Sequence, residues 1–270
     1  MATPMGKMPE VCISLHSHSV QEIIREAGRA AVALADSVEV RFDHLWTIPR
    51  SARETNENGG EAALEETIRP LDDVDVNEAI QAIVEGIELP ILFTCAPSSA
   101  PDGQFPGTMD DRVKVLKMAI ANSVDRIDID THLDENATQQ LMEAAAEAGV
   151  CVVRSDISDE ETPQTEDIVQ RINELGEGAE LVRFVRQCES NIHGLRLVEA
   201  GWALSQQGGA PQRSIGGRGR SGDWPRIHAP LHGDHTVFAV LTEGSRIQST
   251  GRVNARDIRI AWEVLEYPNN

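Results

Sequence analysis

Lysine is scarce in this chain of 270 residues, which has a net charge of −20. Lys7, Lys114 and Lys117 are the only lysines among 24 basic residues, against 44 acidic ones. Nucleic acid is therefore a poor partner, because binding to phosphates needs a basic surface. Many carboxylates with so little lysine favour a surface adapted to high salt, where ions screen the repulsion between like charges. A genomic bias toward arginine is the alternative explanation.

Several patterns that mark particular chemistries are also missing. The four cysteines form no CxxC pair and have no histidine at metal-ligand spacing, so we expect reduced thiols, no metal and no other cofactor. No GxSxG, Walker or HExxH motif occurs. No apolar run approaches the ~18 residues of a membrane span, and no stretch resembles a signal peptide. These absences predict a cytoplasmic protein that has no membrane partner.

Short apolar segments alternate with amphipathic ones along the chain. The apolar segments predict strands at 11–15, 38–42, 90–95, 126–130, 150–154, 181–185, 212–215 and 235–241. Spacing near 3.6 residues predicts helices at 20–35, 74–86, 109–122, 135–148, 164–175, 190–206 and 254–265. This alternation implies a parallel sheet that is covered on both faces, either open or closed. Eight even repeats without a linker favour one α/β domain over 1–270, a (β/α)₈ TIM barrel.

Charged residues occupy strands that should be buried. Glu39 and Arg41 alternate with apolar residues in the second strand, Asp128 and Asp130 in the fourth, and Arg183 stands in the sixth. Residues two apart share one face of a strand, and in a barrel that face points inward. Buried charges are costly without partners. These side chains therefore either bind a polar ligand or pair with one another, for example Glu39 with Arg41.

A glycine-rich segment, SIGGRGRSG, spans 214–222. Its glycines have the spacing of a dinucleotide motif, but Asp-Trp-Pro follows at 223–225, which we do not expect to open a helix. Loops of this kind after the seventh strand often bind phosphate or carboxylate in barrels, and Arg218, Arg220 and Arg226 stand nearby. The segment is therefore either an anion site at 216–222 or a simple surface turn.

The order of several segments resembles that of type I 3-dehydroquinate dehydratases. The matching segments are DSVEVRFDHL at 36–45, PILFTC at 90–95, DGQFPG at 102–107, RIDIDTHL at 126–133, VVRSDISDEETP at 152–163, GAELVRFV at 178–185 and PRIHAPLHGDHTVFAV at 225–240. The resemblance implies a lyase of the shikimate pathway that converts 3-dehydroquinate to 3-dehydroshikimate. Members of that family form an imine between a lysine and the substrate ketone, and a histidine moves the protons.

The resemblance also implies which residues of this chain bind substrate. Glu39, Arg41 and Arg226 match positions that contact substrate in the family. Ser249 and Arg252 lie near the serine and glutamine of a late substrate-binding loop. The ligand implied is a small molecule that carries a carboxylate.

The positions that carry catalysis in the family differ in this chain. Arg183 falls where the family has its imine lysine, Ser155 where it has histidine, and Ala96 where it has a substrate-binding arginine. Arginine stays protonated above pH ~12 and does not form imines. Serine has no titration near neutrality with which to shuttle protons. The three lysines are predicted to lie before the first strand or on an outer helix, where they cannot replace the missing one.

Three functions follow from this combination. The chain is a dehydratase-like enzyme that works without an imine, a non-catalytic homologue that binds a carboxylate ligand or a partner in the old pocket, or another barrel lyase or aldolase with an anion at 216–222. The sequence leaves the oligomeric state open, with a homodimer as one expectation.

Overall fold

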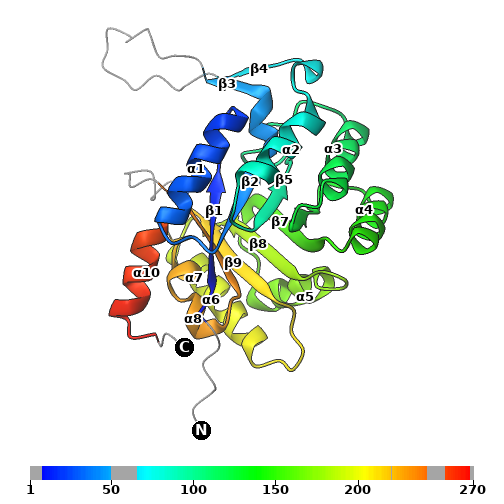
Figure 1. Ribbon diagram of the computed structural model, residues 1–270. Helices are drawn as coiled ribbons and strands as arrows, with labels where there is room; N and C mark the ends of the chain where they lie inside the picture. Colours follow the sequence, from blue (N-terminus) through cyan, green and yellow to red (C-terminus); the bar gives the residue numbers. More distant parts are fainter. Residues whose placement is uncertain (1–7, 50–65, 220, 242–252, 268–270) are drawn as a thin grey trace, which may run out of the picture.

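The computed structural model describes residues 8–49, 66–219, 221–241 and 253–267. Eight parallel strands form one sheet in the order β10-β1-β2-β5-β6-β7-β8-β9 (Figure 1). Their bounds are β1 Glu10–Leu15, β2 Ser37–Arg41, β5 Ile91–Thr94, β6 Arg126–Asp128, β7 Cys151–Glu161, β8 Leu181–Gln187, β9 Arg213–Arg218 and β10 Thr236–Ala239.

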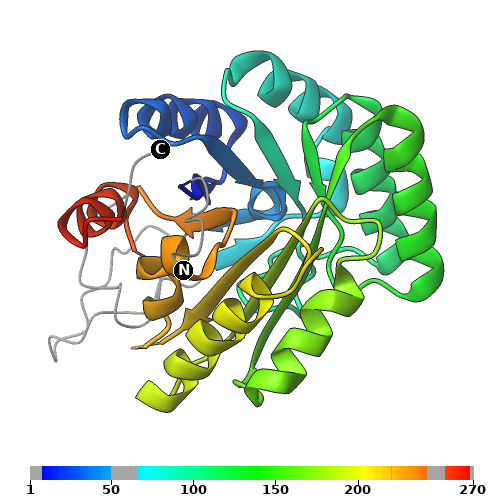
Figure 2. The same ribbon diagram turned by 90° about the horizontal axis from the view of Figure 1, so that it is seen from below.

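The sheet curls into a nearly closed barrel with helices around it (Figure 2). The two terminal strands of the sheet, β9 and β10, approach each other at their amino ends. There the backbone N–H of His235 donates to the carbonyl of Arg213 at 2.8 Å. The N–H of Ile215 donates to the Asp234 carboxylate at 2.6 Å. The predicted (β/α)₈ barrel is therefore confirmed.

The helices lie where the sequence periodicity predicts them. They are α1 Val20–Val32, α2 Val76–Gly86, α3 Met109–Ala121, α4 Glu135–Ala148, α5 Thr165–Leu175, α6 Asn191–Ser205 and α10 Ala255–Val264. Several begin at a residue whose side chain accepts a hydrogen bond from the first turn, among them Ser19, Thr108 and Asp134. Helix α4 ends at Gly149, whose φ of 70° favours glycine.

Some elements differ from the sequence prediction. Strand β7 runs on through polar residues to Glu161, because its ladder with β8 continues past 154. Two short helices, α7 Trp224–Ile227 and α8 Ala229–His232, occupy a segment that was expected to be loop. A small hairpin of β3 Thr47–Pro49 and β4 Glu66–Ile68 and two 3₁₀ turns, η1 Phe42–Trp46 and η2 Leu71–Asp73, complete the described residues. None of the described helices is long and apolar enough to cross a membrane.

The interior of the barrel is filled in layers. An apolar layer is formed by five buried residues from five strands, Cys12, Leu92, Val153, Leu181 and Phe238. The next inward-facing residue on β8 is Arg183, whose guanidinium lies 3.7 Å from the centre of the Phe238 ring. The apolar layer therefore forms the floor on which a polar layer rests, toward the carboxyl ends of the strands. Larger apolar clusters pack the helices against the outside of the sheet.

Candidate functional site

A pocket opens at the carboxyl ends of the strands, where barrel proteins carry their sites. Its cavity of about 40 Å³ has room for a few water molecules. Strand ends and the loop that follows β5 supply its walls. Its lining residues are Glu39, Arg41, Thr94, Ala96, Ala100, Pro101, Asp128, Asp130, His132, Ile157, Arg183, Val185, Arg218 and Arg226.

An ion pair crosses the centre of this pocket. Arg183 Nη1 on β8 donates to Glu39 Oε1 on β2 at 2.6 Å, and both side chains are buried. Ser14 Oγ donates to Glu39 Oε2 at 2.5 Å, and Thr94 Oγ1 donates to Oε1 at 3.0 Å. Burial alone raises the pKa of Glu39, but the charges of Arg183 and Arg41 and the hydrogen bonds from Ser14 and Arg183 hold it below its ordinary value. Glu39 is therefore charged, and it orients Arg183.

Arg41 has different partners from those considered in the sequence. It donates to both carboxylate oxygens of Asp43, at 3.1 and 2.8 Å, and to the carbonyl of Asp102 at 2.6 Å. Asp43 also accepts the backbone N–H of Gln104 at 3.0 Å. The mutual Glu39–Arg41 ion pair is thus not formed among the described residues, because each group has a nearer partner. Arg41 instead ties β2 to the loop that covers the pocket.

Asp128 is the last residue of β6 and Asp130 follows the strand, and the two aspartates differ in their surroundings. Asp130 accepts a hydrogen bond from Arg112 of α3 and another from the backbone N–H of His132 at 2.9 Å. Asp128 is 2 % exposed, and Thr94 Oγ1 reaches only its Oδ2, at 3.4 Å. Burial and then the nearby Asp130 raise the pKa of Asp128 to about 7. Asp128 is therefore partly protonated near neutrality.

Two further arginines stand at the mouth of the pocket. Arg218 contacts the carboxylates of Asp102 at 2.9 Å and Asp159 at 3.3 Å. Arg226 Nη1 donates to the carbonyl oxygens of Gly217 and Gly222, at 2.7 and 2.6 Å. The glycine-rich segment thus presents carbonyl oxygens to an arginine. The N–H groups of its glycines at 217 and 222 are bonded within the turn, at 3.0 and 3.1 Å, and do not form an anion nest.

The structure gathers most of the residues singled out from the sequence. Glu39, Arg41, Arg183 and Arg226 line one pocket. Ser155 is fully buried on β7 and pairs in register with Arg183, so both face the interior. Ser249 and Arg252 lie outside the described residues, as does Arg220.

Sequence reasoning did not assign Thr94 or His132 to the pocket. Thr94 lies two residues after Leu92, which belongs to the apolar floor, so the period of two could have identified it. His132 follows the strand end in a turn and carries no such signal. Among the described residues, no group of three or more His, Cys, Asp or Glu is placed to hold a metal.

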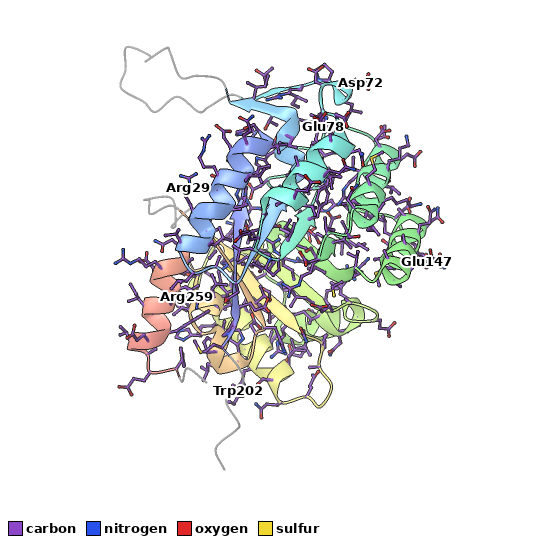
Figure 3. All side chains as sticks on the ribbon, in the orientation of Figure 1. Arg29, Asp72, Glu78, Glu147, Trp202 and Arg259 are labelled. Atoms are coloured by element: carbon purple, nitrogen blue, oxygen red, sulfur yellow. The ribbon has the colours of Figure 1, made fainter. Side chains whose placement is uncertain are left out.

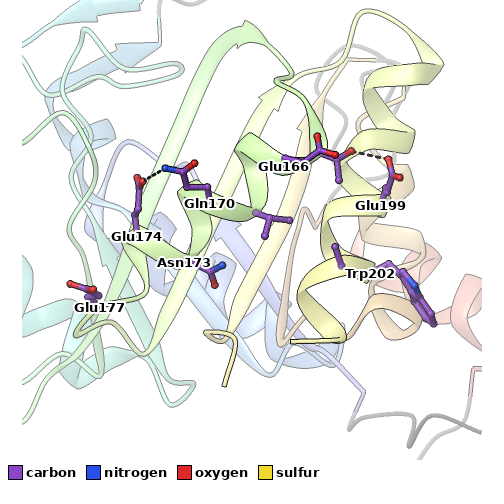
Figure 4. A pocket seen from close by; sticks show the side chains of 10 residues that line it. Glu166, Gln170, Asn173, Glu174, Glu177, Glu199 and Trp202 are labelled. Atoms are coloured by element: carbon purple, nitrogen blue, oxygen red, sulfur yellow. Dashed lines mark hydrogen bonds between the residues drawn. The ribbon is translucent and has the colours of Figure 1, made fainter. Parts of the chain in front are cut away.

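A second hollow lies on the outside of the barrel, between α5 and α6 (Figure 4). Glu166, Glu174 and Glu199 give it an acidic wall, and Trp202 stands at one end. Thr165 donates to Glu199 at 2.8 Å and joins the two helices. This groove is remote from the strand ends and holds none of the residues that the sequence singled out.

The protein has an eight-stranded α/β barrel with a polar pocket at the carboxyl ends of its strands. These features place it in the class of barrel enzymes and their homologues. The model of one family, type I 3-dehydroquinase, matches residues 11–267. The chain belongs to the type I 3-dehydroquinase family.

Known relatives cover almost the whole chain. The 3-dehydroquinate dehydratase of Klebsiella pneumoniae is 26 % identical over 258 residues, which span 94 % of this chain and 92 % of that protein. Among solved structures, the type I 3-dehydroquinate dehydratase from Clostridium difficile superposes with a TM-score of 0.80 and 18 % identity, covering 97 % of this chain and 94 % of that one. The enzyme from Geobacillus kaustophilus gives a TM-score of 0.79 at 19 % identity, covering 98 % and 94 %. The structural likeness shows the fold.

Proposed function

We propose that the chain binds a small hydroxylated carboxylate of the 3-dehydroquinate type in the pocket, and that it does so without forming an imine. Because the cavity of about 40 Å³ holds only a few water molecules, binding requires the groups that line it to move apart. The observation that carries this proposal is the buried pair of Arg183 and Glu39 at the centre of the pocket. The resemblance places Arg183 at the position of the family's lysine. A guanidinium there donates hydrogen bonds to a ligand but does not add to its ketone.

The lysines that the structure describes support the absence of an imine. Lys114 and Lys117 lie on α3, outside the barrel. Lys114 contacts Asp111 at 3.0 Å, and Lys117 donates to Gln140 at 2.9 Å. Neither lines the pocket.

The charges of the pocket favour an anionic ligand. Four arginines line it against three carboxylates, and one of these carboxylates, Asp128, is partly protonated. Three of these arginines already have carboxylate partners: Arg183 has Glu39, Arg41 has Asp43, and Arg218 has Asp102 and Asp159. A ligand carboxylate would therefore share these guanidinium groups with the protein. A carboxylate that enters the pocket can form charge-assisted hydrogen bonds with guanidinium groups. An aldolase or lyase with its anion on the 216–222 backbone is less well supported, because the N–H groups of Gly217 and Gly222 are already bonded within the turn.

Calorimetry with 3-dehydroquinate in a high-salt buffer tests the proposal. The wild type should bind, and Arg226→Met should weaken binding about tenfold or more, since a charge-assisted hydrogen bond is lost. Lys114→Met is the matched control, because its side chain lies on an outer helix. Borohydride added to the complex should trap no adduct. A failure to bind, or a covalent adduct on any lysine, would contradict the proposal.

A further inference from the structure

Three buried polar atoms on consecutive barrel strands have no hydrogen-bond partner among the described residues. They are Asp128 Oδ1 on β6, Ser155 Oγ on β7 and Arg183 Nε on β8. Their side chains are at least nine-tenths buried, with exposed fractions of 2, 0 and 5 %. Buried polar groups without partners are rare and costly in folded proteins. The Ser155 hydroxyl lies near enough to Asp128 to lower the pKa of its carboxyl, whereas Arg183 Nε has no hydrogen-bond partner among the described residues. The cluster is therefore a place where a ligand can supply a partner.

The ladder shows that all three side chains face the same interior space. Ser155 pairs in register with Arg183, and Asp128 pairs with Val153, which lies two residues before Ser155. Residues paired across parallel strands point to the same face, and so do residues two apart on one strand. Val153 belongs to the floor of the barrel, so this face is the inner one. Asp128 and Arg183 line the pocket itself.

We propose that Asp128 is the catalytic base and acid of this pocket, and that Arg183 stabilises the enolate that forms. This inference rests on the proposed function, because it requires a ligand with a ketone and a hydroxyl on the carbon β to it. The Asp128 carboxylate takes the proton from the carbon between these two groups. The electron pair of the broken C–H bond forms a C=C bond, and the carbonyl π electrons move onto the ketone oxygen, beside the Nε–H of Arg183.

The second half of the reaction returns the proton. The enolate reforms the ketone, its C=C electrons form the new double bond, and the bond to the β-hydroxyl breaks. The proton on Asp128 joins the leaving oxygen, so that water departs and Asp128 is again a carboxylate. No oxidant, reductant or imine is needed. A guanidinium can act as the oxyanion donor because it keeps its protons throughout.

The other carboxylates of the pocket are committed to protein partners. Glu39 accepts hydrogen bonds from Arg183, Ser14 and Thr94. Asp130 is held by Arg112 and by the turn at His132. Asp128 keeps one oxygen unbonded, and burial with the neighbouring Asp130 raises its pKa to about 7. A general base works best when its pKa lies near the working pH.

His132 is the competing candidate for moving the proton. It lies at the rim, and its side chain is 28 % exposed. Its Nδ1 lies 3.6 Å from Asp130, and the hydrogen bond to Asp130 raises the pKa of the imidazole. This contact engages Nδ1 of His132 with Asp130 instead of with a ligand. A His132→Gln variant distinguishes the two candidates.

Hydrogen–deuterium exchange into 3-dehydroquinate provides the test. The full chain is incubated with this compound in D₂O at high salt, and NMR follows the protons beside the ketone while absorbance follows the enone product. The wild type should exchange these protons and form product. Asp128→Asn should lower both rates by about a hundredfold or more, while its affinity measured by calorimetry changes little. Asp128→Glu should recover part of the rate, and Lys117→Met should equal the wild type.

The pH profile adds a readout that a purely structural role would not produce. Asp128 acts as the base when deprotonated, so exchange should rise with pH through about 7 and level off above it. The groups around Asp128 in the barrel are Thr94 on β5, Asp130 just after β6, Ser155 on β7, Arg183 on β8 and Glu39 on β2. Arg154, on the other face of β7, acts on it only through its charge. The pKa values of Glu39 and Asp130 are lowered below those of ordinary carboxyl groups, and the pKa of Arg154 is lowered by burial from 12.5.

The outcomes separate this inference from the proposed function. Binding without exchange in the wild type would overturn the inference alone. Exchange that survives in Asp128→Asn, or that is lost in His132→Gln instead, would also overturn it. An absence of binding would overturn the proposed function and this inference together.

Discussion

Arg183 and Glu39 join strands that lie on opposite sides of the barrel. Strands β8 and β2 stand four places apart in the eight-strand order, and the two residues are 144 positions apart in the chain. The guanidinium rests on Phe238 and the carboxylate accepts from Ser14 and Thr94, so both charges are held in a fixed geometry. Such a buried pair costs much to break on one side only, because the remaining charge is left without compensation.

Replacement of Glu39 by glutamine should therefore destabilise the fold. We expect a loss of about 3–5 kcal/mol in the free energy of unfolding, measured by denaturant titration at pH 7. The double variant Glu39→Gln/Arg183→Met removes both charges and should regain part of the loss. A single variant within about 1 kcal/mol of the wild type would show that Arg183 finds another partner.

The effect of Glu39 should also depend on pH. Its pKa in the fold lies below the ordinary value of 4.5. The stabilisation it provides is thus present above pH 4.5 and is lost as the pH falls toward the lower value. The difference in stability between the wild type and Glu39→Gln should shrink on acidification below pH 4.5.

At the scale of the element, the end of β9 depends on its glycines. A Cβ on Gly216 would lie 2.5 Å from Arg226 Nη2, so the missing side chain lets the guanidinium lie against the strand. A Cβ on Gly222 would lie 2.3 to 2.6 Å from backbone atoms of Gly217 and Arg218. The atom that a Cβ on Gly216 would meet is the end of a flexible side chain, which can move. The atoms that a Cβ on Gly222 would meet are backbone, which cannot move as easily. The two glycines therefore serve different purposes.

Alanine substitutions should separate these purposes. Gly216→Ala should displace Arg226 and weaken 3-dehydroquinate binding about tenfold, equivalent to about 1.4 kcal/mol, with little loss of stability. Gly222→Ala should destabilise the fold by about 1–3 kcal/mol through overpacking. Gly28→Ala in α1, where a Cβ meets nothing within 4 Å, is the control and should stabilise by about 0.5–1 kcal/mol. If both variants changed ligand affinity in calorimetry and melting temperature by equal amounts, the two glycines would not have these separate roles.

At the scale of the whole molecule, many acidic residues lie on the outside of the barrel. Asp72, Glu78 and Glu147 illustrate this on the outer face (Figure 3). The few basic residues are largely engaged in pairs, such as Arg126 with Glu10 and Arg259 with Asp36. The net charge of −20 therefore makes the surface repel itself at low ionic strength.

Added salt should stabilise the protein. The melting temperature should rise with KCl, most steeply as the Debye length falls from ~10 Å at 0.1 M to ~3 Å at 1 M. A variant in which four exposed carboxylates on or beside α2 and α4 become amides (Glu85, Glu88, Glu143 and Glu147) should show a flatter dependence. A melting temperature that is independent of salt in the wild type would contradict the salt-adapted surface.

The elements predicted from the sequence match the structure where they depend on residues close together in the chain, and differ where they depend on distant ones. Helices α4 and α5 begin and end within one residue of the predicted positions, because period and capping are local properties. Strand β7 was predicted to end at 154, because its later residues are polar and only its pairing with β8 extends it. Helices α7 and α8 were missed because Pro225 and Pro230 indicated a loop, although proline is accepted in a first helical turn.

The alternation of apolar and amphipathic segments was enough to predict the barrel and the inward charges on its strands, because both follow from spacing along the chain. The pairing of those charges was not predictable in this way. Arg41 pairs with Asp43 two residues away, whereas Glu39 finds Arg183 across the barrel. The pKa of Asp128 is raised because closure of the barrel buries it beside Asp130, although Arg183 on β8 acts in the opposite direction. Burial and distances across the barrel set these partners and charges, and they exist only when the sheet closes.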